Sequence, residues 1–262
     1  MATLPINWLI KINTIIIYCL LIYAFIGALL FIFQRKFLYF PTEEILHSYD
    51  KESISNENET IEIIVLNKGQ EDALLYFGGN AEPVIYNADD FLKAFPMHTV
   101  YLFNYRGYGG SSGTPTEQGI YSDALVLFDR VKKKHAQVSV LGRSLGSCVG
   151  AYLASERPVE KLALVTPFDS IKNVAQDRFV LFPMFLLLKD KFDSVKRVKK
   201  IKAEIIAIIA ENDEVIPNKY SFNLIKAFPP EKITGKVIKD AGHNDISENP
   251  EYYDYLKAFY KD

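Results

Sequence analysis

The sequence predicts an α/β fold in which helices cover both faces of a mostly parallel sheet, with a small cap and one apolar N-terminal helix in front. Three observations predict this arrangement. Short β-rich runs alternate with helix-compatible runs, the middle β-rich runs are apolar throughout, and a long uncharged segment lies near the start of the chain. In sheets of this kind the functional residues lie at the carboxyl ends of the strands.

The uncharged segment, Ile12 to Phe33, is long enough for a helix to cross a hydrocarbon layer of about 30 Å. A cleaved signal peptide is the alternative. The segment exceeds the usual apolar region of such a peptide, about 7–15 residues, and no convincing small-residue cleavage site precedes Gln34. We therefore expect residues 1–40 to be a retained single-pass anchor, with the lipid bilayer as a partner.

The overall composition is that of an ordinary globular chain, with 49% hydrophobic and 24% charged residues. A net charge of −2 argues against nucleic acid as a partner. Lys11 and the terminal amine precede the apolar segment and Arg35 and Lys36 follow it, which favours a cytoplasmic domain only slightly. Cys19 and Cys148 are too poorly placed to form a disulfide, and Cys148 is better interpreted as a buried packing residue than as a reactive thiol.

Residues 41–262 fit one domain with one large core, and the polar segment from Pro41 to Thr60 is interpreted as a connector. The middle strands are unbroken apolar runs, as strands covered on both faces must be. In chain order we expect strand 61–66, strand 73–77, helix 84–94, strand 99–103, helix 116–134, strand 138–141, helix 145–154, strand 161–165, strand 204–209, helix 218–228, strand 236–239 and helix 250–260.

Ser144 lies at an abrupt strand-to-helix turn, between two glycines. The β-rich run that ends at Leu141 stops at Gly142, and a helix-compatible run begins directly after Ser144. A side chain on such a turn requires strained backbone angles and crowds the positions two residues away, where Gly142 and Gly146 stand. Small residues also occur at such turns for reasons of packing alone. The motif therefore indicates a catalytic serine only if a histidine and an acidic residue follow it in the sequence.

An attacking serine needs an imidazole to take its proton and a carboxylate to orient that imidazole. Of the four histidines, only His243 follows Ser144, in a glycine-containing loop after strand 236–239. Asp213 lies between them, in the loop that leaves the apolar strand 204–209. A surface carboxylate and a loop histidine without a task are the alternatives, but three matches in this order, each at a strand end, favour a Ser-Asp-His triad.

Two glycine-rich segments follow early strands. Gly78 and Gly79 precede Asn80, whose backbone N–H can face the serine, so we expect Asn80 and Leu145 to donate N–H groups to an oxyanion. Residues 107–110 are also rich in glycine, as phosphate-binding loops are. They lack the lysine of such a loop and do not open directly into a helix, so we interpret them as a structural turn.

From about Phe40 to its end, the chain resembles the α/β-hydrolase superfamily, specifically its membrane-anchored serine-aminopeptidase-like branch, which includes protein depalmitoylases. The motifs that carry the resemblance are Gly79-Asn80, Tyr105-Arg106-Gly107-Tyr108-Gly109, Gly142-Arg-Ser144-Leu-Gly146, Asp213-Glu-Val-Ile-Pro217 and Gly242-His243-Asn244. The resemblance implies the α/β-hydrolase fold. It also implies a role for each site residue: Ser144 as nucleophile, His243 as general base, Asp213 as its orienter, and Asn80 and Leu145 as oxyanion donors.

The chain departs from this branch at two positions. Relatives usually have histidine where this chain has Gly78, and aspartate where it has Asn104. A further segment, residues 166–202, lies where this fold inserts caps. Its apolar part, 179–188, could line a pocket for an acyl chain while its basic part, 189–202, rests on anionic lipid. A buried cap helix followed by a solvated basic helix is the alternative that we prefer.

These observations predict a membrane-anchored serine hydrolase that cleaves an ester, thioester or amide through an acyl-enzyme, without a metal or organic cofactor. Its substrate would be a small or acylated molecule. A non-catalytic hydrolase-fold protein that binds a partner at the membrane is one alternative. An aminopeptidase is another, and it would need an acidic group for the substrate amine, for which the sequence offers Asp169 and Glu214.

Overall fold

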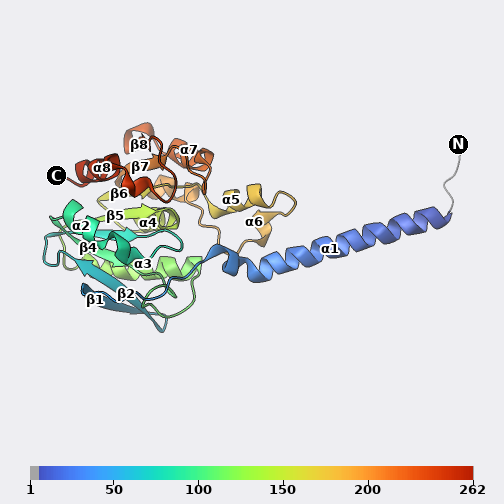
Figure 1. The fold of residues 1–262 in the computed structure, drawn as a ribbon, viewed down its shortest axis with the longest axis horizontal. Helices are drawn as coiled ribbons and strands as arrows, with labels where there is room; N and C mark the ends of the chain where they lie inside the picture. Colours follow the sequence, from blue (N-terminus) through green and yellow to red (C-terminus); the bar gives the residue numbers. More distant parts are fainter. Residues whose placement is uncertain (1–5, 262) are drawn as a thin grey trace.

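An eight-stranded sheet forms the centre of the computed structural model, which describes residues 6–261 (Figure 1). Its strand order is β1-β2-β4-β3-β5-β6-β7-β8. β2 runs antiparallel to its neighbours β1 and β4, and the other neighbouring pairs are parallel, which confirms the predicted mostly parallel sheet. The strands are β1 (Asp50–Asn56), β2 (Glu59–Leu66), β3 (Asp72–Phe77), β4 (His98–Phe103), β5 (Val138–Arg143), β6 (Lys161–Val165), β7 (Glu204–Ala210) and β8 (Ile233–Ile238).

Helices cover both faces of this sheet. One buried cluster joins the sheet to α3, α4 and α7, and a second joins its other face to α2 and α8. Because neighbouring strand residues point to opposite faces, Leu75 of β3 enters the first cluster and Leu74 and Tyr76 the second. The helices of the domain are α2 (Ala88–Ala94), α3 (Glu117–Val131), α4 (Leu145–Glu156), α5 (Ile171–Arg178), α6 (Met184–Leu187), α7 (Asn218–Ala227) and α8 (Pro250–Tyr260).

Some element predictions are wrong in detail. The polar segment predicted as a connector contains β1, which pairs with β2 along its whole length. β1 escaped notice because it is an edge strand in which only Ile54 is buried. The predicted helix 84–94 begins as a 3-10 helix, Val84–Asn87, before α2. β8 begins at Ile233, earlier than predicted, and has the same mostly exposed pattern as other edge strands.

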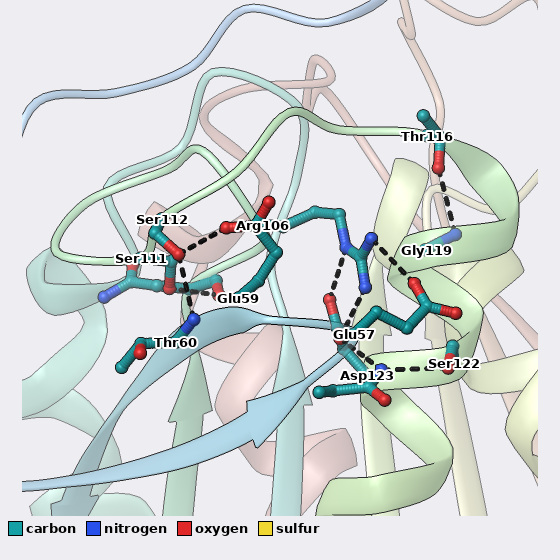
Figure 2. Close-up of polar contacts among 12 residues, drawn as sticks. Glu57, Glu59, Thr60, Arg106, Ser111, Ser112, Thr116, Gly119, Ser122 and Asp123 are labelled. Atoms are coloured by element: carbon teal, nitrogen blue, oxygen red, sulfur yellow. Dashed lines mark hydrogen bonds and ion pairs between the residues drawn. The ribbon is translucent and has the colours of Figure 1, made fainter.

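A buried ion pair fixes the glycine-rich loop between β4 and α3 (Figure 2). Arg106 donates from Nε and Nη2 to the two carboxylate oxygens of Asp123 on α3, both at 2.8 Å, and from Nη1 to Glu57 at 3.1 Å. Ser111 and Ser112 of the same loop bind the backbone of β2. These contacts agree with the interpretation of this loop as a structural turn.

The N-terminal helix α1 (Ile6–Leu38) projects away from the sheet (Figure 1). Its stretch Ile10–Leu38 contains an 18-residue window with a mean hydropathy of 2.8 and is long and apolar enough to cross a membrane. Residues 1–5, with the terminal amine of the predicted anchor, and Asp262 lie outside the described residues.

The expected buried cap helix is wrong. Residues 179–187 form a loop and the single turn α6, which packs beside α1 and α5 and not on the sheet, and most of their apolar side chains are exposed. The basic stretch that follows includes the 3-10 helix Val195–Lys200, where Arg197 packs over the rings of Tyr121 and Tyr152.

The Arg106–Asp123 pair yields a stability prediction. Asp123→Ala leaves the Arg106 guanidinium buried with only its single bond to the exposed Glu57, so we expect the free energy of unfolding to fall by about 3–5 kcal/mol. The measurement is urea denaturation of the full chain in detergent micelles. The control is Asp129→Ala on the same helix, whose pair with Arg157 is exposed to solvent; it should cost no more than about 1 kcal/mol. Equal losses in the two variants would contradict the importance of the buried pair.

Candidate active site

Ser144 has a strained backbone at the junction of β5 and α4. Its φ of 51° and ψ of −116° lie outside the regions that side chains favour. Glycine is required at positions 142 and 146 because a side chain at either position would collide with backbone atoms. A Cβ on Gly142 would lie 2.2 Å from the carbonyl oxygen of Gly146, and one on Gly146 would lie 1.9 Å from that of Phe77. The turn therefore holds the Ser144 side chain out at the end of β5.

His243 joins the other two predicted side chains. Its Nε2 lies 3.0 Å from Ser144 Oγ, and its Nδ1 lies 2.8 Å from Asp213 Oδ2. The second oxygen of Asp213 accepts the N–H groups of Val215 and Ile216, at 3.0 and 2.6 Å. The imidazole and carboxylate are almost fully buried, at 6% and 1% exposure. The structure thus brings the three side chains into one hydrogen-bonded chain that can move a proton from the serine to the imidazole.

The two expected oxyanion donors flank the serine. Asn80 follows β3, and Leu145 is the first residue of α4; within residues 6–261 neither backbone N–H donates to another residue. Beside Ser144 lies a pocket of about 490 Å³. It is lined by Phe40, Gly79, Asn80, Ala81, Glu82, Pro83, Arg143, Ser144, Val215, His243 and Asn244. A carbonyl bound in this pocket can meet both the hydroxyl and the backbone donors.

The Glu82 carboxylate holds the oxyanion loop, and the sequence analysis missed it. Its Oε2 accepts the Gly79 N–H at 2.6 Å, and its Oε1 accepts the Tyr76 hydroxyl and, at 2.7 Å, the Asn87 amide. A Cβ on Gly78 would lie 2.8 Å from a methyl group of Val84, so a larger side chain at this position would require Val84 to move. The sequence signal was an acidic residue three positions after Gly79, the spacing at which a carboxylate reaches back to a backbone N–H.

Arg143 holds the histidine loop and was also missed. It donates to the carbonyl oxygens of His243 and Asn244, at 3.1 and 2.8 Å. Because Arg143 directly precedes Ser144, the bond links the position of the imidazole to that of the hydroxyl. The other departure from relatives, Asn104, lies outside the pocket lining and donates to Glu62 at 3.0 Å.

The oxyanion loop is also tied to the end of α1. The Asn80 side chain accepts the Phe40 N–H at 3.1 Å and the Tyr108 hydroxyl at 2.7 Å, and it donates to the carbonyl oxygen of Leu38. Phe40 itself lines the pocket. The N-terminal helix therefore ends at the wall of the pocket.

Other candidate residues of the sequence have structural surroundings. Asp169 is buried and accepts the amides of Asn173 and Asn223, at 3.0 and 3.3 Å. Glu214 accepts the His243 backbone N–H at 3.0 Å. Burial raises the pKa of the Cys148 thiol to about 12, as suits a packing residue. In the described part of the chain, no group of three or more His, Cys, Asp or Glu side chains is arranged to hold a metal ion.

Comparisons with known proteins agree with this architecture. A family profile described as the alpha/beta hydrolase fold matches residues 76–187. An uncharacterized protein of Mycobacterium tuberculosis is 29% identical over 240 residues, 84% of either chain. The alpha/beta hydrolase domain-containing protein aho-3 of Caenorhabditis elegans is 28% identical over 71% of this chain and 56% of its own. An esterase of Pyrococcus furiosus, Pf2001, superposes with a TM-score of 0.66 at 20% identity, over 84% of this chain and 98% of the esterase.

The chain thus has the α/β-hydrolase fold, as the sequence predicted. The family profile supports the α/β-hydrolase superfamily and hydrolase activity of this general kind, and the structural neighbours support the fold.

The contacts of the glycines yield a second prediction. Gly146→Ala places a methyl group against the Phe77 carbonyl and must move α4 away from β3, which displaces Ser144. We expect hydrolysis of a p-nitrophenyl ester to fall about 10²-fold or more. Gly235→Ala in β8 is the control, because its Cβ would approach only Ile225, at 3.7 Å. A Gly146→Ala protein with full turnover would contradict the requirement for glycine at this turn.

Proposed function

We propose that this chain is a membrane-anchored serine hydrolase that cleaves an ester, thioester or amide bond through an acyl-enzyme. The hydrogen bonds of His243 to Ser144 and Asp213 carry this proposal, because an ordinary hydroxyl becomes a nucleophile when a positioned imidazole takes its proton. The pocket beside these residues is large enough for the scissile group of a small or acylated substrate.

The reaction would proceed in two halves. In the first, Ser144 Oγ attacks the carbonyl carbon while His243 Nε2 takes the hydroxyl proton, and the N–H groups of Asn80 and Leu145 stabilise the oxyanion. His243 then gives the proton to the leaving group, which departs. In the second half a water attacks the acyl-enzyme with His243 again as base, and Ser144 recovers its proton when the acid leaves. Asp213 stays ionised and keeps the imidazole oriented.

The same proposal covers the organisation of the chain. Residues 1–40 would be a single-pass anchor in the lipid bilayer, and residues 41–262 the hydrolase domain with its cap at 166–202. The hydropathy of α1 and its position at the pocket wall support this arrangement. The proposed reaction uses no metal or organic cofactor, and we propose no nucleic-acid partner. The charges on either side of the apolar helix favour a cytoplasmic position for the hydrolase domain slightly.

The alternatives draw little support from the site. An aminopeptidase needs a free carboxylate for the substrate amine, but the carboxylate that lines the pocket, Glu82, already accepts three donors. Asp169 and Glu214 lie outside the pocket lining, where Asp169 accepts the Asn173 amide and Glu214 accepts the His243 backbone N–H. A non-catalytic binding protein would not need His243 in contact with both Ser144 and Asp213.

Ser144→Ala tests the nucleophile. It removes the attacking oxygen, so we expect loss of p-nitrophenyl ester turnover and of covalent labelling by a fluorophosphonate, with an unchanged thermal unfolding midpoint. Ser155→Ala, near the other end of α4, is the control and should leave both activities unchanged. Undiminished turnover by Ser144→Ala would refute the assignment, and absence of labelling in the unaltered protein would favour the non-catalytic alternative.

Glu82→Gln tests the positioning of the oxyanion loop. The glutamine keeps the shape, but its amide nitrogen cannot accept a hydrogen bond, so at least one donor of the loop loses its partner. We expect kcat to fall about 10²-fold with little change in KM, because misplaced oxyanion donors weaken transition-state binding. Steady-state kinetics measure both constants, with exposed Glu160→Gln as control. A change confined to KM would contradict this role.

A further inference from the structure

An apolar surface on the cap remains unexplained by the proposed chemistry. We define the cap tip as residues 179–187, the loop after α5 together with α6. Val180, Leu181 and Leu186 are 73%, 76% and 68% exposed, and none of the cap tip lines the pocket beside Ser144. A contiguous group of large exposed apolar side chains on a folded domain marks an interaction site.

The cap tip is held against the apolar helix α1 (Figure 1). The Tyr23 hydroxyl donates to the carbonyl oxygen of Leu181 at 2.7 Å, and the Tyr23 ring stacks on Phe182 with ring centroids 4.7 Å apart. One turn further along α1, Gly27 faces the same Phe182 ring, from which a Cβ at this position would lie 3.6 Å away. The apolar surface of the cap tip is therefore continuous with that of α1.

Charged and polar contacts gather at one end of this shared surface. Arg35 pairs with Asp190 at 2.7 Å, and the Gln34 side chain donates to the carbonyl oxygen of Leu187 at 3.0 Å and accepts the Lys189 N–H at 2.6 Å. Lys36 is a neighbouring cation on α1. Basic residues at the end of an apolar helix are typical of the level of lipid head groups.

We propose that the cap tip is inserted into the hydrocarbon of the lipid bilayer beside α1, as a second membrane-embedded element. The inference rests on the proposed span of α1. At 1.5 Å per residue, about 18 Å of helix separates Tyr23 from Arg35. With Arg35 at the head groups, Leu181 and Phe182 lie well inside an apolar layer of about 30 Å.

Several backbone groups of the cap tip are already bonded within the protein. A loop in hydrocarbon must have its polar groups bonded within the protein. The Gln176 side chain brackets the loop: it donates to the Phe182 carbonyl oxygen and accepts the Met184 N–H, both at 3.0 Å. Tyr23 and Gln34 donate to two further carbonyl oxygens. Pro183 has no N–H to satisfy.

Lipid fits this surface better than a second protein because the continuous apolar surface ends where the basic residues begin.

Insertion of the cap tip would also fix the position of the pocket relative to the membrane. Since the end of α1 is bonded to Asn80, and the cap tip fixes the domain against α1, the opening beside Ser144 is kept near the head groups. An acyl group from the bilayer then has a short path to the serine.

Depth-dependent fluorescence quenching tests the proposal on the full-length chain in phosphatidylcholine vesicles. In a Cys19→Ser background a fluorophore is attached to one introduced cysteine: Leu181→Cys or Leu186→Cys in the cap tip, Ile22→Cys in α1, or exposed Tyr86→Cys near α2. Buried Cys148, with its raised pKa, stays unlabelled. We expect lipid with a mid-chain nitroxide to quench the Leu181→Cys and Ile22→Cys labels about twofold or more, and the Tyr86→Cys label hardly at all.

The outcomes separate the cap tip from the anchor. If the Ile22→Cys label is quenched and the labels at both cap positions are not, the cap tip is outside the bilayer and the inference is wrong while the anchor stands. If the Ile22→Cys label is not quenched either, the anchor fails as well. Cap labels that are blue-shifted yet unquenched would show that a second copy or another protein covers this surface, which also overturns the inference.

Discussion

The strained turn at Ser144 is the constraint on which the rest of the site depends. Two strands and a helix meet so closely there that glycine is required at 142 and 146, and the serine must adopt a positive φ. The parallel sheet makes this strain tolerable because β5 is paired on both sides, with β3 and β6. The same pairing brings the loop after β3 beside the serine, and the loops after β7 and β8 supply its acid and its imidazole.

Two charged side chains stabilise the loops around this turn. Glu82 binds the backbone before Asn80, and Arg143 binds the backbone of His243 and Asn244. Both side chains bind backbone atoms rather than substrate. They therefore fix the positions of the oxyanion loop and of the imidazole relative to the Ser144 hydroxyl. The glycine pair before Asn80 carries no side chain that could hold this loop, and the Glu82 carboxylate holds it instead.

The N-terminal helix is part of the site's architecture as well as a candidate anchor. Its last turn is bonded to Asn80, and its middle and end are bonded to the cap tip. The domain is thus attached to α1 at two separate places, and free rotation about a flexible linker is prevented. If α1 spans a bilayer, the orientation of the pocket relative to the membrane follows from these contacts.

The sequence by itself determined the mostly parallel sheet, the turn at Ser144 and the order of Asp213 and His243. Apolar runs and flanking glycines are local patterns, and in a parallel sheet the residues that follow the strands gather at one edge. It did not reveal β1, since an edge strand buries too little to leave an apolar pattern. The roles of Glu82 and Arg143, and the packing of the cap tip on α1, were decided only by tertiary structure. The partner of a polar side chain cannot be inferred from the residues next to it in the sequence. Tyr23 and Leu181 are 158 residues apart in the chain, and only the tertiary fold brings them into contact.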